Sequence, residues 1–273
     1  MPKTILITGC SSGIGLCAAK VLHNLGYHVL ATARKKKDVI NLKKQGLDSF
    51  LLDISSSKSI NNSVKEIFKR TPYLYAIFHN AGFAIPGALE DLSRKAFREQ
   101  FETNVFGTAE LTAKLLPLMR KQGYGRIIIN SSILGFVSMP FRGAYNSSKY
   151  ALEGFADTLR LELPNNIYVS LIEPGPITSK FRENAYKNFL RYINPGKSDY
   201  RKEYSTLVKR FKTKDTETPF NLPPGAVVKK LIKALESKKP KARYYVTFPT
   251  YLFAYLKRLL PANFLDFLLR KVN

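Results

Sequence analysis

The sequence predicts an α/β fold: a Rossmann-type, doubly wound parallel sheet of about seven strands flanked by helices, in a single domain over residues 1–273. Short apolar runs rich in β-branched residues alternate with helical patterns, which is the βαβ signature. The runs are continuously apolar, as expected of parallel strands that are buried on both faces. A glycine-rich turn also joins the first run to the first helical pattern, where such sheets bind phosphate groups.

Seven apolar runs are expected to form the strands, and one long segment interrupts their rhythm. The runs are TILIT (4–8), YHVLATA (27–33), SFLLD (49–53), YAIFHN (75–80), RIIINS (126–131), IYVSLIEP (167–174) and RYYVTF (243–248). Residues 3–180 are the predicted cofactor-binding and catalytic core. Residues 176–223 carry scattered aromatics and many lysines, which is typical of a substrate lid. Residues 249–273 hold two apolar segments separated by Pro261.

Composition narrows the class of protein. The two cysteines, Cys10 and Cys17, are not accompanied by a CxxC or HxxxH pair, so neither a disulfide framework nor a metal site is expected. The N-terminal residues lead directly into the first strand without a signal-peptide pattern, and no uncharged run is long enough to span a membrane. These features predict a reduced, cytoplasmic protein.

The net charge of +24 would attract any polyanion, whether nucleic acid, an anionic membrane or a phosphorylated small molecule. The basic residues are spread along the chain, and the densest run, residues 34–37, has no interleaved aromatic residues and no nucleic-acid-binding motif. A solvated, lysine-rich surface is therefore favoured over specific nucleic-acid binding.

The first predicted strand ends in the loop TGCSSGIG, residues 8–15. Gly9, Gly13 and Gly15 permit a tight turn and close approach of the backbone to a pyrophosphate, which would bind the amides at the start of the next helix. The predicted cofactor-binding loop also contains Ser11, Ser12 and Ile14. Its GxxxGxG spacing differs from the commoner GxGxxG, so the strand before it and the helix after it carry the prediction.

The second and third strands end where the adenosine half of a dinucleotide would bind. A carboxylate after the second strand would select NAD, but this strand ends in Ala33 and Arg34, and a guanidinium favours the 2′-phosphate of NADP(H). Arg34 could instead simply open a basic loop. Asp53 could accept a hydrogen bond from the adenine amino group, with Ile54 against the ring, although an aspartate at a strand end is also an ordinary turn residue.

Tyr145 and Lys149 are spaced to lie on one face of a helix. A nearby cation stabilises a phenolate, so Lys149 is expected to lower the pKa of Tyr145 toward that of a working acid or base. The pair alone is weak support for chemistry, because this spacing is frequent on solvated helices. Ser132 closes the fifth strand and Asn104 lies in an apolar helical stretch, and the four polar residues together predict a catalytic site.

These motifs resemble the classical short-chain dehydrogenase/reductase family, which has a TGxxxGxG loop, an NNAG motif and an Asn-Ser-Tyr-Lys tetrad. The resemblance covers residues 3–180 and includes Thr8 to Gly15, the segment Asn80, Ala81 and Gly82, the tetrad Asn104, Ser132, Tyr145 and Lys149, and a later segment containing Pro174, Gly175, Ile177 and Thr178. His79 replaces the first asparagine of NNAG. Within the family, the sequence is similar to bacterial NADP-dependent aldehyde reductases and, more distantly, to hydroxysteroid and retinol dehydrogenases.

The resemblance implies an oxidoreductase that transfers a hydride between the nicotinamide of NADP(H) and a carbonyl or alcohol. Ser132 would polarise the carbonyl, and Tyr145 would donate the proton as general acid. Lys149 would bind the nicotinamide ribose, and Asn104 would hold a water that resupplies protons. The segment from Pro174 to Thr178 would flank the nicotinamide.

Aromatic residues in the lid segment favour a small apolar substrate, such as an aldehyde, ketone, steroid or retinoid. The apolar segment at 249–273 is expected either to pack in a homo-oligomer or to contact an anionic membrane as an interfacial helix. A non-catalytic NADP-binding or nucleic-acid-associated scaffold with the same fold is the alternative function.

Overall fold

The computed structural model describes residues 2–213 and 219–271 and contains the predicted doubly wound sheet. Seven parallel strands pair in the order β3-β2-β1-β4-β5-β6-β7. Their bounds are β1 (Thr4–Ile7), β2 (His28–Ala33), β3 (Asp48–Leu51), β4 (Ala76–His79), β5 (Gly125–Asn130), β6 (Ile167–Glu173) and β7 (Arg243–Tyr245). The fold class and the order of the strands along the chain are confirmed.

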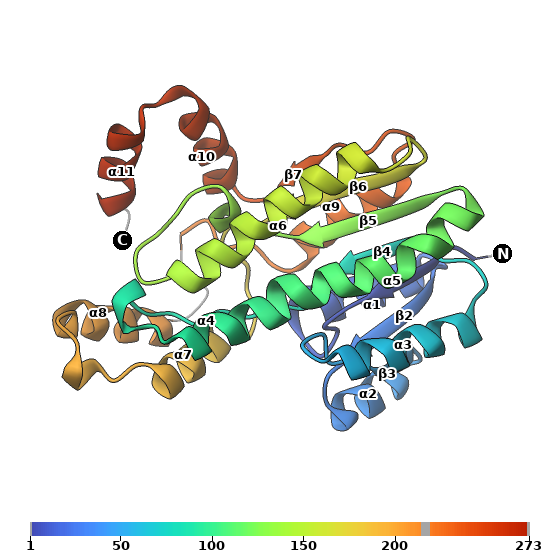
Figure 1. Ribbon diagram of the computed structural model, residues 1–273, viewed down its shortest axis with the longest axis horizontal. Helices are drawn as coiled ribbons and strands as arrows, with labels where there is room; N and C mark the ends of the chain where they lie inside the picture. The colour runs from blue at the N-terminus through green and yellow to red at the C-terminus, as the bar shows by residue number, and fades with distance from the viewer. Residues whose placement is uncertain (1, 214–218, 272–273) are drawn as a thin grey trace.

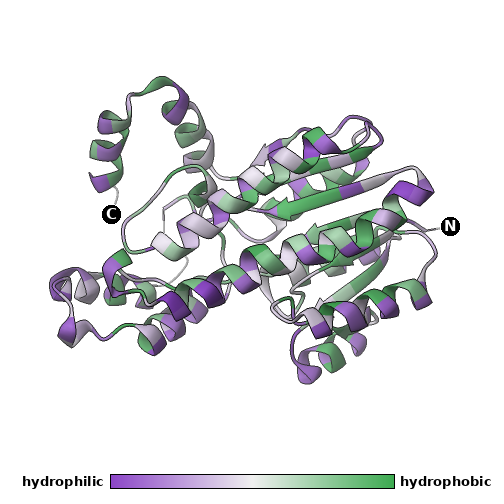
Figure 2. Ribbon diagram, in the orientation of Figure 1, coloured by the Kyte–Doolittle hydropathy of each residue, from purple (hydrophilic) through white to green (hydrophobic). Residues whose placement is uncertain are grey.

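Helices cover both faces of the sheet (Figure 1). One layer consists of α1 (Gly13–Asn24), α2 (Lys36–Lys43) and α9 (Gly225–Glu236), which share a buried apolar cluster with β1 and β2. The other layer consists of α3 (Ser57–Arg70), α5 (Gly107–Gln122) and α6 (Gly143–Glu162). Because both faces are covered, the strands are largely apolar, and Figure 2 shows β5 green toward its arrowhead.

Local signals set the ends of these helices. Ser56 is the N-cap of α3, and its side chain accepts a hydrogen bond from the Ser59 amide. Gly123 follows α5 with a φ of +77°, in the left-handed region that glycine adopts without strain. The chain therefore turns sharply from α5 into β5.

Two stretches differ from the sequence prediction. RYYVTF (243–248) was expected to be one strand, but only Arg243–Tyr245 pairs, because Phe248 already begins α10 (Phe248–Leu259). The helical stretch around Asn104 is also irregular: α4 (Arg94–Phe101) continues into a π-helical turn at Glu102–Phe106 before α5. Such turns are frequent at functional sites.

The segments beyond the sheet gather at its carboxyl edge. The predicted lid contains α7 (Phe181–Tyr192), a 3-10 turn at Pro195–Lys197 and α8 (Arg201–Lys212); residues 214–218 of it lie outside the described residues. α10 and α11 (Ala262–Lys271) form a C-terminal hairpin. Figure 1 shows the arrowhead of β5 pointing toward the side where α7, α8, α10 and α11 lie. None of the helices in the described ranges is long and apolar enough to cross a membrane.

Candidate active site

The glycine loop, residues 8–15, packs tightly against the residues that directly follow β4. Gly9 and Gly13 have φ values of +75° and +57°, and a Cβ on Gly15 would lie 2.3 Å from the Gly9 carbonyl oxygen. These positions therefore require glycine. Ser12 is the N-cap of α1 and makes no side-chain capping hydrogen bond, so the first amides of α1 remain open toward the loop. The arrangement fits a pyrophosphate.

Asn80 and Ala81 fasten this loop from the neighbouring strand. The Thr8 hydroxyl accepts hydrogen bonds from the amides of Asn80 and Ala81, both at 2.9 Å. The Asn80 side chain donates to the carbonyls of Thr8 at 3.0 Å and Gly9 at 3.2 Å. Asn80 thus holds the glycine loop in shape through its own side chain.

His79, the departure from the family motif, lies in the core. Its Nε2 is 2.9 Å from the Thr112 hydroxyl, and burial lowers its pKa to about 3, so the imidazole is neutral. No hydrogen-bond partner for Nδ1 occurs among the described residues. His79 therefore packs in the core, next to Thr112, and does not face the site.

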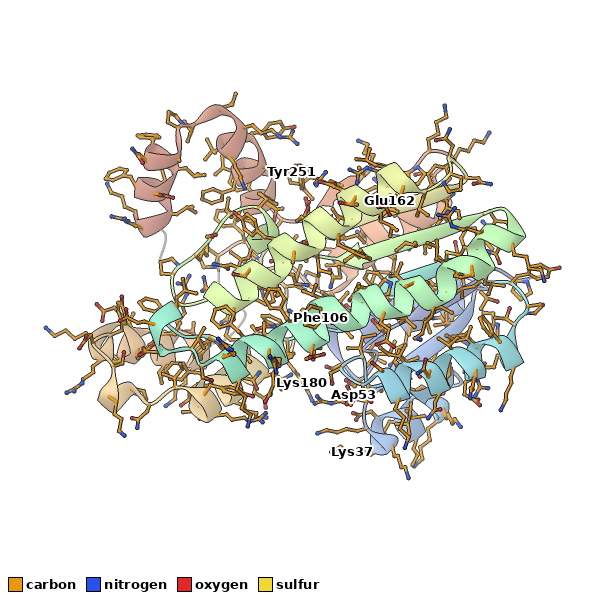
Figure 3. The ribbon with its side chains drawn as sticks, viewed as in Figure 1. Lys37, Asp53, Phe106, Glu162, Lys180 and Tyr251 are labelled. Carbon is orange, nitrogen blue, oxygen red and sulfur yellow. The ribbon has the colours of Figure 1, made fainter. Side chains whose placement is uncertain are left out.

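At the adenosine end, Arg34 follows β2 and is exposed, beside the basic start of α2. Asp53 is engaged within its own turn, because its carboxylate accepts from the Ser55 amide at 3.1 Å and the Ser55 hydroxyl at 2.7 Å. Asp53 therefore acts as a turn residue in this structure, which was the alternative to adenine binding. Ile54 is buried, and its carbonyl oxygen would lie 1.9 Å from a Cβ on Gly107. Figure 3 labels Asp53 and Lys37 on the same side of the molecule.

At the reacting end, α6 carries Tyr145 in its first turn and Lys149 in its second. Both side chains are buried, and Lys149 Nζ lies 5.7 Å from the centroid of the Tyr145 ring. Lys149 donates a hydrogen bond to the Asn130 carbonyl at 2.8 Å. Ser132 caps a short 3-10 turn at Ile133–Gly135, where its hydroxyl accepts from the Leu134 amide at 3.1 Å, and the same hydroxyl lowers the pKa of the Tyr145 phenol. The structure therefore brings Ser132, Tyr145 and Lys149 together.

The electrostatics of Tyr145 differ from the sequence expectation. Burial raises its pKa to about 12, and the hydrogen bond from Ser132 and the positive charge of Arg142 only partly oppose this. Arg142 is the cation that lowers the pKa of Tyr145 in this structure, while burial lowers the pKa of Lys149 itself to about 8. The expected role of Lys149 in lowering the pKa of Tyr145 stays a prediction, and Arg142 was missed.

Asn104 lies in the π-helical turn, and its side-chain hydrogen bonds are made within the protein. Oδ1 accepts from the Phe83 amide at 3.1 Å, and Nδ2 donates to the Phe83 carbonyl at 3.1 Å and the Ser148 hydroxyl at 3.0 Å. A Cβ on Gly82 would lie 3.3 Å from Asn104 Oδ1 and 3.9 Å from Lys149 Nζ, so Gly82 lies next to both side chains. The water-holding role of Asn104 stays a prediction.

The Pro174 segment joins the two ends of the site. The Pro174 carbonyl accepts from the Ile133 amide at 2.8 Å, beside Ser132. Gly175 lies against Thr247, whose hydroxyl would be 2.2 Å from a Cβ there, so glycine is required. Thr178 donates its amide to the Leu222 carbonyl at 2.9 Å. Ser179 then reaches the glycine loop, with its Cβ 3.2 Å from the position of a Cβ on Gly13.

A buried charge network behind Ser132 was also missed. The Ser131 hydroxyl donates to Glu153 at 2.5 Å, and the Glu153 carboxylate acts on the pKa of Glu173, which is fully buried. Arg243 lies 3.2 Å from Glu173 and 3.3 Å from Glu153, and also pairs with Asp157 at 2.7 Å. These residues come from α6, β6, β7 and the end of β5, so no local motif could reveal them.

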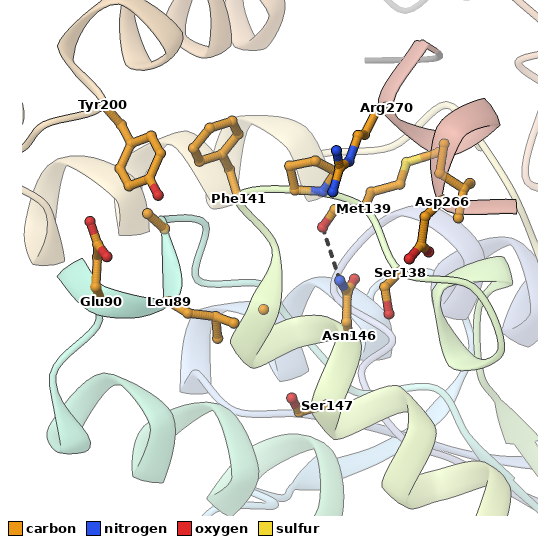
Figure 4. A pocket seen from close by; sticks show the side chains of 14 residues that line it. Leu89, Glu90, Ser138, Met139, Phe141, Asn146, Ser147, Tyr200, Asp266 and Arg270 are labelled. Carbon is orange, nitrogen blue, oxygen red and sulfur yellow. Dashed lines mark hydrogen bonds between the residues drawn. The ribbon is translucent and has the colours of Figure 1, made fainter. Parts of the chain in front are cut away.

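The ring of Phe181 and a nearby cavity complete the surroundings of Tyr145. The ring of Phe181, at the start of α7, packs edge-on against Tyr145 with centroids 5.4 Å apart. A cavity of about 480 Å³ lies nearby, between α11 and the segment before α6 (Figure 4). None of the four tetrad residues is among the described residues that line it.

Among the described residues there is also no cluster of His, Cys, Asp and Glu side chains that could hold a metal ion.

The chain belongs to the short-chain dehydrogenase/reductase family and is an oxidoreductase. Residues 3–189 match the family described as short chain dehydrogenase. The parallel sheet, the glycine loop and the buried Ser-Tyr-Lys group are arranged as this assignment requires.

The relatives are similar over nearly the full chain. The chain is 44% identical over 272 residues to an uncharacterized oxidoreductase, YbbO, of Escherichia coli strain K12, with 99% of this chain and 95% of that protein covered. It is 33% identical to an NADPH-dependent 3-dehydrocapnine reductase of Ornithobacterium rhinotracheale, with 96% and 94% covered.

Solved structures share the fold. A short-chain dehydrogenase from Streptomyces avermitilis has a TM-score of 0.78 at 26% identity, over 95% of this chain and 94% of that one. Structures with lower identity were solved with NAD, for a Burkholderia phymatum protein with a TM-score of 0.78, and with NADP, for ElxO with a TM-score of 0.72. Members of this fold thus bind either dinucleotide.

Proposed function

We propose that the protein is an NADP(H)-dependent reductase or dehydrogenase that transfers a hydride between the nicotinamide and the carbonyl or alcohol carbon of an apolar substrate. The observation that carries the proposal is the group formed by Ser132, Tyr145 and Lys149 at the carboxyl edge of the sheet, joined to the glycine loop by the Pro174 segment. Ligands of doubly wound sheets bind at this edge.

The residues fit a dinucleotide along this edge. The amides at the start of α1, with Gly9 to Gly15, would hold the pyrophosphate, and the segment from Pro174 to Thr178 would contact the nicotinamide. Lys149 would exchange its bond to the Asn130 carbonyl for the ribose hydroxyls. Asp53 and Ile54 would border the adenine. The cofactor supplies the hydride when bound, and the protein supplies position and proton transfer.

NADP(H) is favoured over NAD(H) because the position after β2 carries a guanidinium and no carboxylate. Arg34 is exposed and Lys35, Lys36 and Lys37 add positive charge beside it. The similar reductase whose name specifies NADPH supports the same choice. A planar guanidinium can bind a phosphate through two parallel hydrogen bonds.

Tyr145 would transfer the proton. The Ser132 hydroxyl lowers the pKa of the phenol and would hold the substrate oxygen by a hydrogen bond. Tyr145 then donates its proton to that oxygen, and a cation nearby stabilises the phenolate that remains. Lys149 becomes such a cation when it leaves Asn130 for the ribose, and Asn104 lies beside it for resupply of the proton.

The substrate side is apolar. Phe181, Tyr186, Phe189 and Phe211 from α7 and α8 contribute to the apolar clusters next to Tyr145. These contacts favour an apolar aldehyde, ketone or alcohol, with steroid-like and retinoid-like compounds included. A cytoplasmic location and a homo-oligomer, with peripheral membrane contact through the C-terminal hairpin, complete the proposal.

Replacing Tyr145 by Phe tests the assigned acid. Tyr145→Phe removes one hydroxyl from a buried ring, so NADPH should still bind while NADPH-dependent reduction of a panel of aldehydes, steroids and retinoids falls by roughly 10³-fold or more. NADPH binding is followed by nucleotide fluorescence. Retained turnover in the variant would refute the assignment. Absence of turnover in the wild type across the panel, with tight binding of nucleic acid at moderate salt, would instead favour the scaffold alternative.

A further inference from the structure

The cavity between α11 and the segment before α6 has a buried amide in its wall (Figure 4). Asn146 lines the cavity from the first turn of α6 and is 7% exposed. Its Nδ2 donates a hydrogen bond to the Met139 carbonyl at 3.0 Å, whereas its Oδ1 is buried and accepts no hydrogen bond from the described residues. A carbonyl oxygen can only accept, so the amide group that faces Met139 is the NH2 and the free group is the oxygen.

The free oxygen defines the kind of group that the cavity would bind. A buried acceptor without a partner is unfavourable, and folded proteins leave few of them. A hydroxyl or an ammonium group can donate to Asn146 Oδ1, whereas an ether oxygen or a carboxylate cannot. The cavity volume of about 480 Å³ is within the range of small-molecule sites, roughly 300–1,000 Å³.

The charged residues of the cavity favour the same groups. Glu90 and Asp266 line it on opposite sides, as Figure 4 shows, and neither carboxylate forms an ion pair with a described residue. Arg270 is the one basic side chain among the described lining residues. Two carboxylates and one guanidinium leave the lining negative, in a chain with 44 basic and 20 acidic residues. The lining therefore favours a neutral or cationic group over an anion.

The backbone of one wall is held in an unusual conformation. Phe141 lines the cavity and has a φ of +59°, which a bulky side chain rarely adopts. Its carbonyl accepts from the Gly87 amide at 2.8 Å, and its ring packs on Tyr200 and Tyr204 with centroids 5.4 Å and 5.7 Å away. Strained residues that their surroundings maintain are concentrated at functional and ligand sites.

Two apolar side chains connect the cavity to the proton donor. Met139 and Leu269 line the cavity and also pack in the cluster that contains Tyr145. Tyr145 and Asn146 are consecutive on α6, so their Cα atoms are about 3.8 Å apart. One molecule can therefore present a carbonyl to Tyr145 and a second polar group to Asn146, with its apolar part against Met139 and Leu269.

We propose that the cavity binds the end of the substrate that is remote from the carbonyl, and that this end carries a hydroxyl or ammonium group that donates a hydrogen bond to Asn146 Oδ1. The preferred substrate is then an apolar chain with a carbonyl at one end and a hydrogen-bond donor at the other. This inference rests on the proposed reductase function and names its substrate class.

The test compares ω-hydroxy aldehydes of increasing chain length with the matching ω-methoxy aldehydes, with NADPH as the reductant. The two compounds share the aldehyde and the chain, and the ether cannot donate, so their kcat/KM ratio isolates the donor. At the best chain length the wild type should prefer the hydroxy compound by about tenfold, mainly through KM. ω-Trimethylammonio aldehydes are cationic but have no donor, so they should fall between the two.

An asparagine variant locates the preference. Asn146→Leu removes the acceptor with little change in volume and should bring the hydroxy-to-methoxy ratio toward one, whatever it does to the shared chemistry. The matched control is Asn166→Leu, before β6 at the opposite edge of the sheet, whose exposed side chain also donates to a backbone carbonyl, that of Gly123. The control should keep the ratio of the wild type. Thermal unfolding and NADPH binding verify that each variant is folded.

A second variant tests the cavity without disturbing the bond between Asn146 and Met139. Ser147 is exposed and lines the cavity, so an indole at this position fills space without entering the core. Ser147→Trp should lower kcat/KM for the long hydroxy aldehydes more than for the short ones. An equal effect at every chain length would place the chain of the substrate elsewhere and overturn the proposal.

The remaining outcomes are also distinguishable. Equal use of hydroxy and methoxy compounds by the wild type at every chain length overturns the donor site and leaves the reductase function intact. A preference that survives in a folded Asn146→Leu variant, or a trimethylammonio compound used better than the hydroxy compound, assigns the selection to other residues and also overturns it. Reduction of none of these compounds, nor of any aldehyde in the panel, removes the proposed function and this inference with it.

Discussion

Lys149 depends on a carboxylate one helical turn further along α6. Burial lowers the pKa of Lys149 to about 8, and the negative charge of Glu153 is what opposes that decrease. Glu153 is in turn held by the Ser131 hydroxyl at 2.5 Å and by Arg243. A residue that no catalytic motif includes therefore helps to keep the proposed ribose-binding lysine charged near neutral pH.

Replacing Glu153 by Gln should shift the pH profile. Loss of the carboxylate lowers the pKa of Lys149 further, so the alkaline limb of kcat/KM for NADPH-dependent reduction should move to lower pH. The control is Glu162→Gln, an exposed position near the far end of the same helix, labelled in Figure 3. A packing defect alone would reduce activity at all pH values without moving the limb, and an unmoved limb would contradict the assigned role.

Arg34 is the residue that decides the cofactor in our proposal. Arg34→Ala combined with Ala33→Asp removes the guanidinium and places a carboxylate after β2, so the preference should change from NADPH toward NADH by roughly 10²-fold in relative kcat/KM. Both cofactors are measured with one aldehyde. A ratio that stays at the wild-type value would mean that the 2′-phosphate is bound elsewhere.

Among the elements, β7 is short, but the ion pairs of Arg243 join it firmly to its neighbours. Only Arg243–Tyr245 pairs with β6, but Arg243 joins carboxylates of α6 and β6 through Glu153, Asp157 and Glu173. Burial and the neighbouring charge of Glu153 raise the pKa of Glu173 to about 9, so Glu173 is protonated at neutral pH. Tyr245, on the same strand, faces this group as well.

The raised pKa of Glu173 predicts a pH dependence of stability. The pKa of Glu173 is raised in the folded state, so its contribution is fully present below about 4.5, the value of a free glutamate, and is lost as the pH rises through about 9. Glu173→Gln mimics the protonated form and should remove this loss. The Tm of the wild type should therefore fall more steeply between neutral pH and about pH 10 than that of the variant. Parallel curves would show that Glu173 is ionised in the folded protein.

The ends of elements were harder to predict than their presence. The seven apolar runs and the TGxxxGxG loop identify the parallel sheet and the phosphate end, because strand burial and helix-start chemistry are local. The end of β7 was wrong because Val246 and Thr247 suit a strand by propensity, while the packing of Thr247 against Gly175 and the start of α10 end it.

The site was predictable to the extent that it is local. Tyr145, Lys149, Ser132 and the glycine loop follow from motifs, and the structure places the first three together. Arg142 and the Glu153–Glu173 pair could not be found, since their partners come from elements far apart in sequence. Asp53 shows the opposite case. Its position predicts a contact with the adenine, but its carboxylate already accepts a hydrogen bond from Ser55 in the same turn.

At the scale of the molecule, the C-terminal hairpin has two apolar faces. Phe253, Leu265 and Leu269 pack into the cluster that contains Tyr145, while Tyr255, Leu259, Phe264 and Phe267 are exposed on the outside. Figure 1 shows the hairpin projecting beside the carboxyl edge, and Figure 3 labels Tyr251 on it. The last turns of the two helices carry Lys257, Arg258, Arg270 and Lys271.

This outer face predicts salt-dependent binding to anionic lipid. Sedimentation with anionic liposomes should occur at low salt and weaken at high salt or with neutral lipid, because apolar side chains and basic residues act together. Phe264→Glu combined with Phe267→Glu should abolish it, whereas Phe68→Glu, at an exposed position on α3, should not. A double variant that changes the oligomeric state instead, with no wild-type binding to liposomes, would assign the face to subunit packing.

The ring of Phe181 resting on Tyr145 has a consequence for the rate of turnover. A carbonyl group that approaches Tyr145 from this side meets that ring first, and the ring begins α7, which is tied to α8 through Arg182 and Thr213. We therefore expect the start of α7 to move aside and return in each catalytic cycle. If that step limits turnover, kcat will fall as solvent viscosity rises, and a smaller side chain at position 181 will weaken the dependence.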